Sequence, residues 1–231
     1  MLEISQTGWT AIALTLRIAV AATIVATPLG VAAAWLLSRK AFPGKVLLEA
    51  LVHLPLVLPP VVTGYLLLLT FGRHGAVGAF LADHLGIVFA FRWTGAALAC
   101  GIMGFPLLVR PIRISFEAID LRLEQAATTL GASPLNVFAS VTFPLALPGV
   151  IAGMVLCFAK ALGEFGATIT FVSNIPGETQ TISSAIYALI QTPNGDAAAL
   201  QLIVVSVLIA VAALMASEWF ARRAVLRLRG E

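Results

Sequence analysis

Between two long apolar parts of this chain lies the segment Gln125-Ala126-Ala127-Thr128-Thr129-Leu130-Gly131, followed ten residues later by Val141-Thr142-Phe143-Pro144. Its small side chains and its final glycine are typical of a short helix that ends in a left-handed cap. A helix of this length cannot cross a membrane, because a membrane span needs about 20 mostly apolar residues. The fold class therefore has to be derived from the apolar residues on either side.

The composition is that of an integral membrane protein. Hydrophobic residues make up 60% of the 231 residues and charged residues 11%, whereas about a quarter of the residues of a soluble domain are charged. Apolar and polar residues do not alternate along the apolar segments, so helices are favoured over a barrel. We predict an all-α, polytopic membrane helical bundle. It forms a single transmembrane domain over residues 1–231, with five spans at about residues 12–38, 46–72, 93–115, 147–172 and 197–220.

The basic residues predict the orientation of this bundle. Ten of the 14 Lys and Arg residues lie near the ends of the first, third and fifth spans, and only Arg17, Arg73 and Arg92 lie on the opposite side. Because Lys and Arg are enriched in cytoplasmic loops, we expect the N-terminus outside and the C-terminus in the cytoplasm. Met1–Trp9 has no basic residue and the first apolar run is longer than a signal core, so we expect this span to be retained. The net charge of +3 then reflects orientation and gives no reason to expect nucleic acid.

The loop of about residues 116–146 is expected on the cytoplasmic side, with two short helices meeting at a glycine corner. Gly131 suits the left-handed cap of the first helix, and Ser133 and Pro134 suit the N-cap and first position of the second. Ala126 and Ala127 leave room for the surface of a partner to approach closely. An ordinary interfacial helix-turn-helix connection is the alternative interpretation.

This loop resembles the cytoplasmic "EAA" loop of the membrane subunits of bacterial ABC importers. That pattern is Glu-Ala-Ala, three residues, Gly, nine residues, Ile, one residue and Leu-Pro. The resemblance implies that the loop inserts into a cleft of a separate ATPase subunit and transmits its closure. Gln125 stands where the pattern has glutamate, and Glu124 is the adjacent candidate for a carboxylate contact. The predicted coupling residues are Glu124, Gln125, Ala126, Ala127, Gly131, Ser133 and Pro134.

Two further stretches, Gly163–Ile182 and His53–Val62, resemble the permease subunits of molybdate importers. Sulfate and thiosulfate permeases are relatives that share a shorter Gly-Glu-Phe-Gly core. The resemblance implies a multi-pass permease of the bacterial cytoplasmic (inner) membrane that translocates molybdate, and with it tungstate, by alternating access. A sulfate or thiosulfate importer permease is the alternative.

The partners expected from this resemblance are a second copy of the chain, two ATPase subunits and a periplasmic or extracellular oxyanion-binding protein. The chain has no GxxxxGK[ST] segment for nucleotide phosphates, so ATP hydrolysis has to come from a partner. We therefore expect a chain that is not an enzyme, has no catalytic residues and binds no cofactor itself. ATP and Mg are expected on the ATPase.

Several polar or helix-breaking residues are candidates for the translocation pathway. The prolines of Leu54–Pro60 remove backbone donors, which indicates either a plain packing kink or a wall of the pathway. Lys160 and Glu164 are four residues apart and can pair, either as pathway groups or as a neutral packing device. Hydroxyl groups supply the weak, distributed contacts that conduction of a dianion needs. The pathway candidates are Pro59, Pro60, Lys160, Glu164, Thr168, Thr170 and Ser173.

Other patterns give weaker signals. His74 and His84 lack the spacing of a helical zinc pair, so no metal site is predicted. The Gly72, Gly75 and Gly78 series lacks the Lys-Ser/Thr ending of a phosphate-binding loop. The loop that contains it is expected to be a docking surface for a solute-binding protein or merely a solvated surface. An intramembrane enzyme and an independent secondary transporter or channel are the two other function classes considered.

Overall fold

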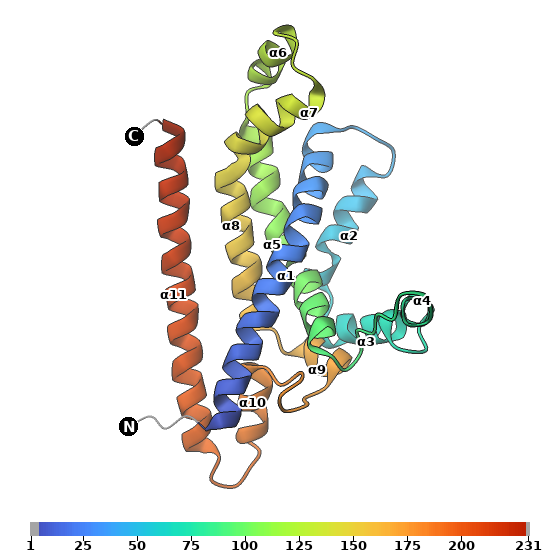
Figure 1. Cartoon of the computed structure of the whole chain (residues 1–231), viewed down its shortest axis with the longest axis vertical. Helices are drawn as coiled ribbons and strands as arrows, with labels where there is room; N and C mark the ends of the chain where they lie inside the picture. Colours follow the sequence, from blue (N-terminus) through green and yellow to red (C-terminus); the bar gives the residue numbers. More distant parts are fainter. Residues whose placement is uncertain (1–4, 230–231) are drawn as a thin grey trace.

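The computed structural model describes residues 5–229, and the side chains of residues 5–216. Four long helices run roughly along the long axis of the molecule: α1 (Gln6–Arg39), α5 (Trp93–Ala118), α8 (Phe143–Leu162) and α11 (Asp196–Arg229). The described part of the chain contains helices joined by turns and loops, so the predicted all-helical membrane bundle is confirmed (Figure 1). The shorter helices are α2 (Lys45–Val57), α3 (Pro60–Phe71), α4 (Ala76–Leu85), α6 (Leu121–Thr129), α7 (Pro134–Val137), the π-helix η1 (Phe138–Thr142), α9 (Gly166–Val172) and α10 (Ile182–Leu189).

The core of the bundle consists of α1, α5 and α8. Small residues let these helices approach closely, as is usual where lipid rather than water surrounds a bundle. A Cβ atom on Gly153 of α8 would lie 2.5 Å from the carbonyl oxygen of Leu108 on α5. Leu108, Ile112 and Phe116 of α5 are completely buried. These contacts make the three helices a closely packed scaffold on which the other elements are placed.

Four helical segments are long and apolar enough to cross a membrane within the described residues, namely Gln6–Arg39, Trp93–Ala118, Pro134–Leu162 and Asp196–Ala216. The pair α2 and α3 makes a fifth only if it counts as one span, because its axis bends by 116°. The bend lies where the prolines predict a break: α2 ends at Val57 and α3 begins at Pro60. Pro59 and Pro60 have no N–H group, so the hydrogen-bond ladder of α2 cannot continue through them.

One predicted span consists of two helices and not of one. Residues 147–172 do not form a single helix, because α8 ends at Leu162 and α9 begins at Gly166. Glu164 therefore lies in the break and not on the same helix as Thr168. A backbone donor left without a helical partner at the break is paired locally, since the Glu164 carboxylate accepts a hydrogen bond from the N–H of Ala167 at 2.9 Å. A side chain that replaces a missing backbone partner in this way cannot be read from hydropathy.

The boundaries of the predicted loop also differ from those observed. α5 continues to Ala118, and α7, η1 and α8 follow one another from Pro134, so the loop is shorter than residues 116–146. At the other end of the chain α11 extends to Arg229. The basic residues used to place the C-terminus, Arg222, Arg223, Arg227 and Arg229, lie outside the residues whose side chains are described.

The π-helix η1 joins the loop to α8. Its wider turn ends with the N–H of Phe143 donating to the carbonyl of Phe138, five residues earlier. The ring of Phe138 lies 6.3 Å from that of Trp35, 6.4 Å from that of Phe116 and 6.0 Å from that of Phe143. η1 thus connects the loop to α1, α5 and α8 through one aromatic cluster.

Candidate functional site

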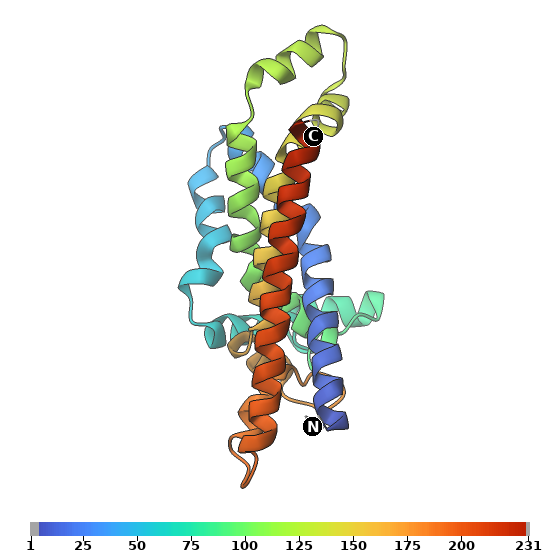
Figure 2. The same ribbon diagram turned by 90° about the vertical axis from the view of Figure 1, so that its left-hand side faces the viewer.

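The helix α6 projects beyond one end of the bundle, opposite the end that holds α10 and the beginnings of α1 and α11 (Figures 1 and 2). None of its residues is buried. Leu123 is 49% exposed, Leu130 is 88% exposed and Leu135, on α7, is 75% exposed. Exposed apolar side chains on a projection that extends past the long helices are typical of a surface for a partner.

The turn between α6 and α7 has the predicted capping residues. Gly131 has φ +89°, and a Cβ atom there would meet nothing within 4 Å, so the backbone conformation alone requires glycine. Ser133 is the N-cap of α7 and accepts the N–H of Asn136 at 3.4 Å, with Pro134 in the first helical position. Asp120 caps the start of α6 by accepting the N–H of Arg122 at 2.9 Å. The corner is therefore shaped by local hydrogen bonds.

Glu124 ties α6 to the bundle. Its Oε1 accepts a hydrogen bond from Arg39 Nη2 at 2.8 Å and another from Thr142 Oγ1 at 2.9 Å. The Arg39 side chain is 13% exposed and that of Glu124 is 22% exposed. Because Arg39 ends α1 and Thr142 ends η1, a single carboxylate connects the projecting helix to two elements of the bundle. Gln125 and Ala126 are exposed, whereas Ala127 is half-buried.

Sequence reasoning missed Arg39 and Thr142 as members of this site. Arg39 was used only as evidence for orientation. Thr142 lies between two positions of the EAA-like pattern, and no role was assigned to it. No signal in the sequence identifies this pairing of Arg39, because a guanidinium at the end of an apolar run can reach water without a carboxylate partner.

The break between α8 and α9 contains the second group of predicted residues. Lys160 Nζ donates to Glu164 Oε2 at 2.6 Å, so the predicted pair forms. The Glu164 side chain is 1% exposed and that of Lys160 is 28% exposed. Both oxygens of the carboxylate are used, one by Lys160 and one by the backbone of α9. This arrangement neutralises the buried charge and fixes the angle between the two helices.

The hydroxyl groups predicted for the pathway differ in how exposed they are and in whether they already donate a hydrogen bond within the protein. Thr168 Oγ1 donates to the carbonyl of Phe165 at 2.9 Å and is buried, and Thr170 Oγ1 donates to the carbonyl of Gly166 at 2.8 Å. Ser173 is exposed and has φ +66°, a conformation that L-residues rarely adopt. Of the three, Ser173 thus presents the most accessible hydroxyl.

The structure brings the prolines of the α2–α3 break next to α9. A Cβ atom on Gly166 would lie 2.8 Å from Cβ of Pro60, and one on Gly64 would lie 2.5 Å from the carbonyl oxygen of Ala167. Pro59 and Pro60 therefore share one region with the residues of α9. This region and the projecting α6–α7 loop are separate places in the fold (Figure 1).

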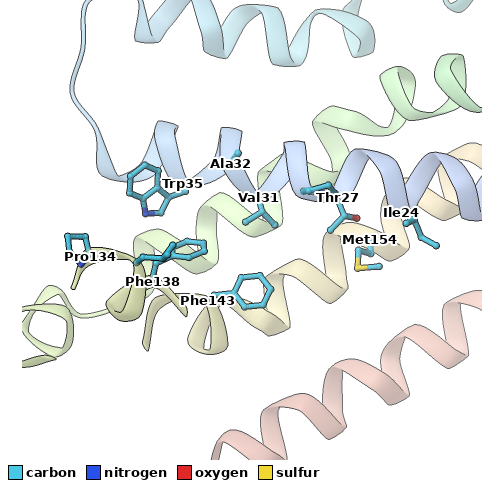
Figure 3. Close-up of a pocket in the computed structure, with 11 residues that line it drawn as sticks. Ile24, Thr27, Val31, Ala32, Trp35, Pro134, Phe138, Phe143 and Met154 are labelled. Atoms are coloured by element: carbon cyan, nitrogen blue, oxygen red, sulfur yellow. The ribbon is translucent and has the colours of Figure 1, made fainter. Parts of the chain in front are cut away.

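A cavity of about 800 Å³ lies between α1 and α8 near the loop. Figure 3 shows Val31 and Trp35 of α1 opposite Phe143 and Met154 of α8, with Phe138 at one end. No charged residue lines it, and none of the predicted pathway residues does. A dianion would be poorly stabilised in such a cavity, because burying an unpaired charge among apolar groups is costly.

Within the described residues no group of three or more His, Cys, Asp or Glu side chains is placed to hold a metal ion. Cys100 and Cys157 are buried with free thiols.

Comparison with known proteins gives concordant results. The family model for the binding-protein-dependent transport system inner membrane component matches residues 26–225. The molybdenum transport system permease protein ModB of Escherichia coli (strain K12) is 56% identical over 214 residues, which is 93% of each chain. The protein of the same name from Haemophilus influenzae is 53% identical over 213 residues, 92% of this chain and 93% of the other.

The fold is similar to that of a solved bacterial ABC transporter that imports the acidic polysaccharide alginate. The TM-score is 0.74 at 18% identity, with 95% of this chain and 80% of that chain covered. At this level of identity the similarity concerns the fold.

Proposed function

The chain belongs to the family of binding-protein-dependent transport system inner membrane components, and from this premise we infer that it is the permease subunit of a molybdate ABC importer. It is accordingly a multi-pass inner-membrane protein that forms part of a transport pathway and is not an enzyme. The observation that supports molybdate as the substrate is the 56% identity across nearly the whole length of a molybdenum permease. Tungstate, a near-isostere of molybdate, is proposed as a second substrate.

The subunit works with a separate ATPase and a periplasmic binding protein. We propose that the whole assembly contains two copies of this chain and two ATPase subunits that bind ATP and Mg. A homodimer is supported by the apolar lining of the cavity between α1 and α8 of the single bundle, which offers no route for a dianion. Two bundles facing one another can enclose a pathway that one bundle does not.

The α6–α7 loop is proposed as the element that inserts into the ATPase. Its exposed leucines, the exposed Ala126 and the glycine corner are suited to a cleft in a partner. The loop then lies in the cytoplasm, with the start of α1 outside. Gln125, Ala126, Gly131, Ser133 and Pro134 shape the contact surface, and Glu124 holds α6 to the bundle through Arg39 and Thr142.

Alternating access follows if closure of the ATPases draws the two loops together and tilts the helices attached to them. α8 receives this movement through η1, and α9 follows α8 through the Lys160–Glu164 pair. We propose that the pathway runs near the contact of α3 with α9, where Pro59, Pro60, Thr170 and Ser173 lie together with Glu164 and Thr168.

The test uses vesicles that contain the complete assembly. Uptake of labelled molybdate should be competed by tungstate at similar concentrations and by sulfate only at much higher ones. Equal competition by sulfate would favour a sulfate or thiosulfate importer instead. An ATPase subunit should copurify with the chain, whereas uptake by the purified chain without any ATPase would indicate an independent transporter.

A further inference from the structure

A second cavity, of about 700 Å³, lies between the α3–α4 turn and the segment that leads into α5. Arg73 and His74 line one side of it and Arg92 the other, while the remaining lining residues are apolar or glycine and include no carboxylate. The ion pairs within the described residues all join other side chains. Arg73, His74 and Arg92 are exposed residues that line this cavity, and none of them has an ion-pair partner among the described residues.

Arg73 and Arg92 lie on the side of the protein where few basic residues are expected. Basic residues on the outer side of a membrane protein oppose its correct orientation, so they are kept to a minimum there. In the proposed orientation that side has only Arg17, Arg73 and Arg92. Two of the three line this cavity, and the guanidinium of Arg17 lies 3.8 Å from the centre of the ring of Trp93, the residue after Arg92. The outer positive charge is thus gathered around one place.

The walls of the cavity are held in shape by close backbone packing. A Cβ atom on Gly75 would collide with the carbonyl of Leu69, and one on Gly78 with the carbonyl of Gly72. The rings of Phe71 and Phe89 meet edge to face at 5.9 Å and join the two sides. The Gly72, Gly75 and Gly78 series thus forms a tight turn that places Arg73 and His74 at the cavity. The backbone around the cavity is thus preformed, and binding has to order only the exposed side chains of Arg73, His74 and Arg92.

We propose that this cavity binds a tetrahedral oxyanion. The planar fork of a guanidinium matches two oxygens of such an ion, and these charge-assisted hydrogen bonds are stronger than neutral ones. Arg92 directly precedes α5, a segment long and apolar enough to cross a membrane, so the cavity lies at one end of that segment. Two sources of the ion have this chemistry: the phosphate of a lipid headgroup and a free oxyanion such as molybdate.

The test measures how fast phenylglyoxal modifies each arginine in the purified importer assembly, with peptide mass spectrometry as the readout. Molybdate or sulfate, added at constant ionic strength against chloride, should slow the reaction of Arg73 and Arg92 at least about threefold if a bound oxyanion covers both groups. Arg110 is exposed on α5 and lines no part of the cavity, so it serves as the internal control.

The two sources are separated by the surroundings of the assembly. Slow reaction in phosphatidylglycerol nanodiscs without added anion, and fast reaction in lipid-free detergent, identifies a headgroup phosphate. Slow reaction in both surroundings only after adding molybdate or sulfate identifies a free oxyanion. The proposal is overturned if neither condition protects Arg73 and Arg92, or if only the solute-binding protein protects them, because the cavity would then be a protein-docking surface.

A variant gives a quantitative check. The quantity measured is the oxyanion concentration that halves the reaction rate of Arg73. Arg92→Gln should raise this concentration about tenfold, as expected for the loss of one charge-assisted contact. Arg110→Gln is the matched control and should leave it unchanged. Any role of the cavity in uptake rests on the proposed function, but the binding result does not. Protection without molybdate uptake would refute only the proposed function, and uptake without protection would refute only this site.

Discussion

Replacing Glu124 with glutamine should lower molybdate uptake without detaching the ATPase. The amide can still accept the hydroxyl of Thr142, but the charge opposite Arg39 is lost. Both side chains of the pair are less than a quarter exposed, so the interaction is worth more than a typical surface ion pair. We take about 1 kcal/mol, within the range for side chains of one network, which corresponds to about a fivefold change.

The assay is a double-mutant cycle in vesicles that contain the complete assembly, with molybdate uptake and ATP hydrolysis measured together. Glu124→Gln and Arg39→Gln should each raise the ATP consumed per molybdate about fivefold, and the double variant should be no worse than either single one. Exchange of the two charges, Arg39→Glu with Glu124→Arg, should recover part of the loss. Glu117→Gln is the matched control, because Arg113 keeps a second carboxylate, Glu49.

One result would refute this reasoning. If Glu124→Gln releases the ATPase during purification while Arg39→Gln has no effect, the carboxylate acts on the partner and not within the subunit. Thermal stability measured for each variant separates this effect from general unfolding, since a merely structural role would lower stability without changing the ATP consumed per ion.

The remaining predictions concern three other places in the fold. Gly131→Val should uncouple ATP hydrolysis from uptake, whereas Gly44→Val, which imposes a similar backbone strain at φ +92° in another turn, should not; equal uptake in both variants would contradict a role for the α6–α7 corner. Lys160→Ala and Glu164→Ala should each abolish uptake, and the double variant should restore part of it, because it leaves no unpaired charge; a double variant as inactive as the singles would favour a direct role in the pathway. Gly153→Val should destabilise the α5–α8 contact by about 2 kcal/mol, measured by thermal unfolding in detergent, while Gly163→Ala, in open space, should change little.

The sequence predicted well those features that depend on composition and on local chain chemistry. The helical membrane bundle follows from apolar length, and the corner at Gly131, Ser133 and Pro134 follows from the backbone preferences of these residues. The Lys160–Glu164 pair follows from a spacing of four residues. Each of these inferences uses residues that are close together in the chain.

The features that the sequence did not predict depend on contacts between distant residues. Arg39 and Glu124 are 85 residues apart, and hydropathy gives no sign of their pairing. The break at Gly163–Phe165 was missed because the apolar pattern continues across it while a side chain satisfies the exposed backbone. The prolines indicated that α2 would end, but the 116° bend depends on how Gly64 and Gly166 let α3 lie against α9.

The π-helix η1 has a consequence for insertions and deletions. A π-turn contains one residue more than the α-helix it interrupts, so removal of a single residue from Phe138–Thr142 would allow an ordinary helix to form. Because each residue of a regular α-helix advances by about 100°, removal of one residue from α8 itself would rotate everything before the deletion by that angle, whereas the π-turn can lose its extra residue with little rotation. A deletion in α8 would thus point the tip of α6 away from its partner, although the amino acids of the tip are intact. We therefore expect a one-residue deletion to be tolerated better in Phe138–Thr142 than in α8.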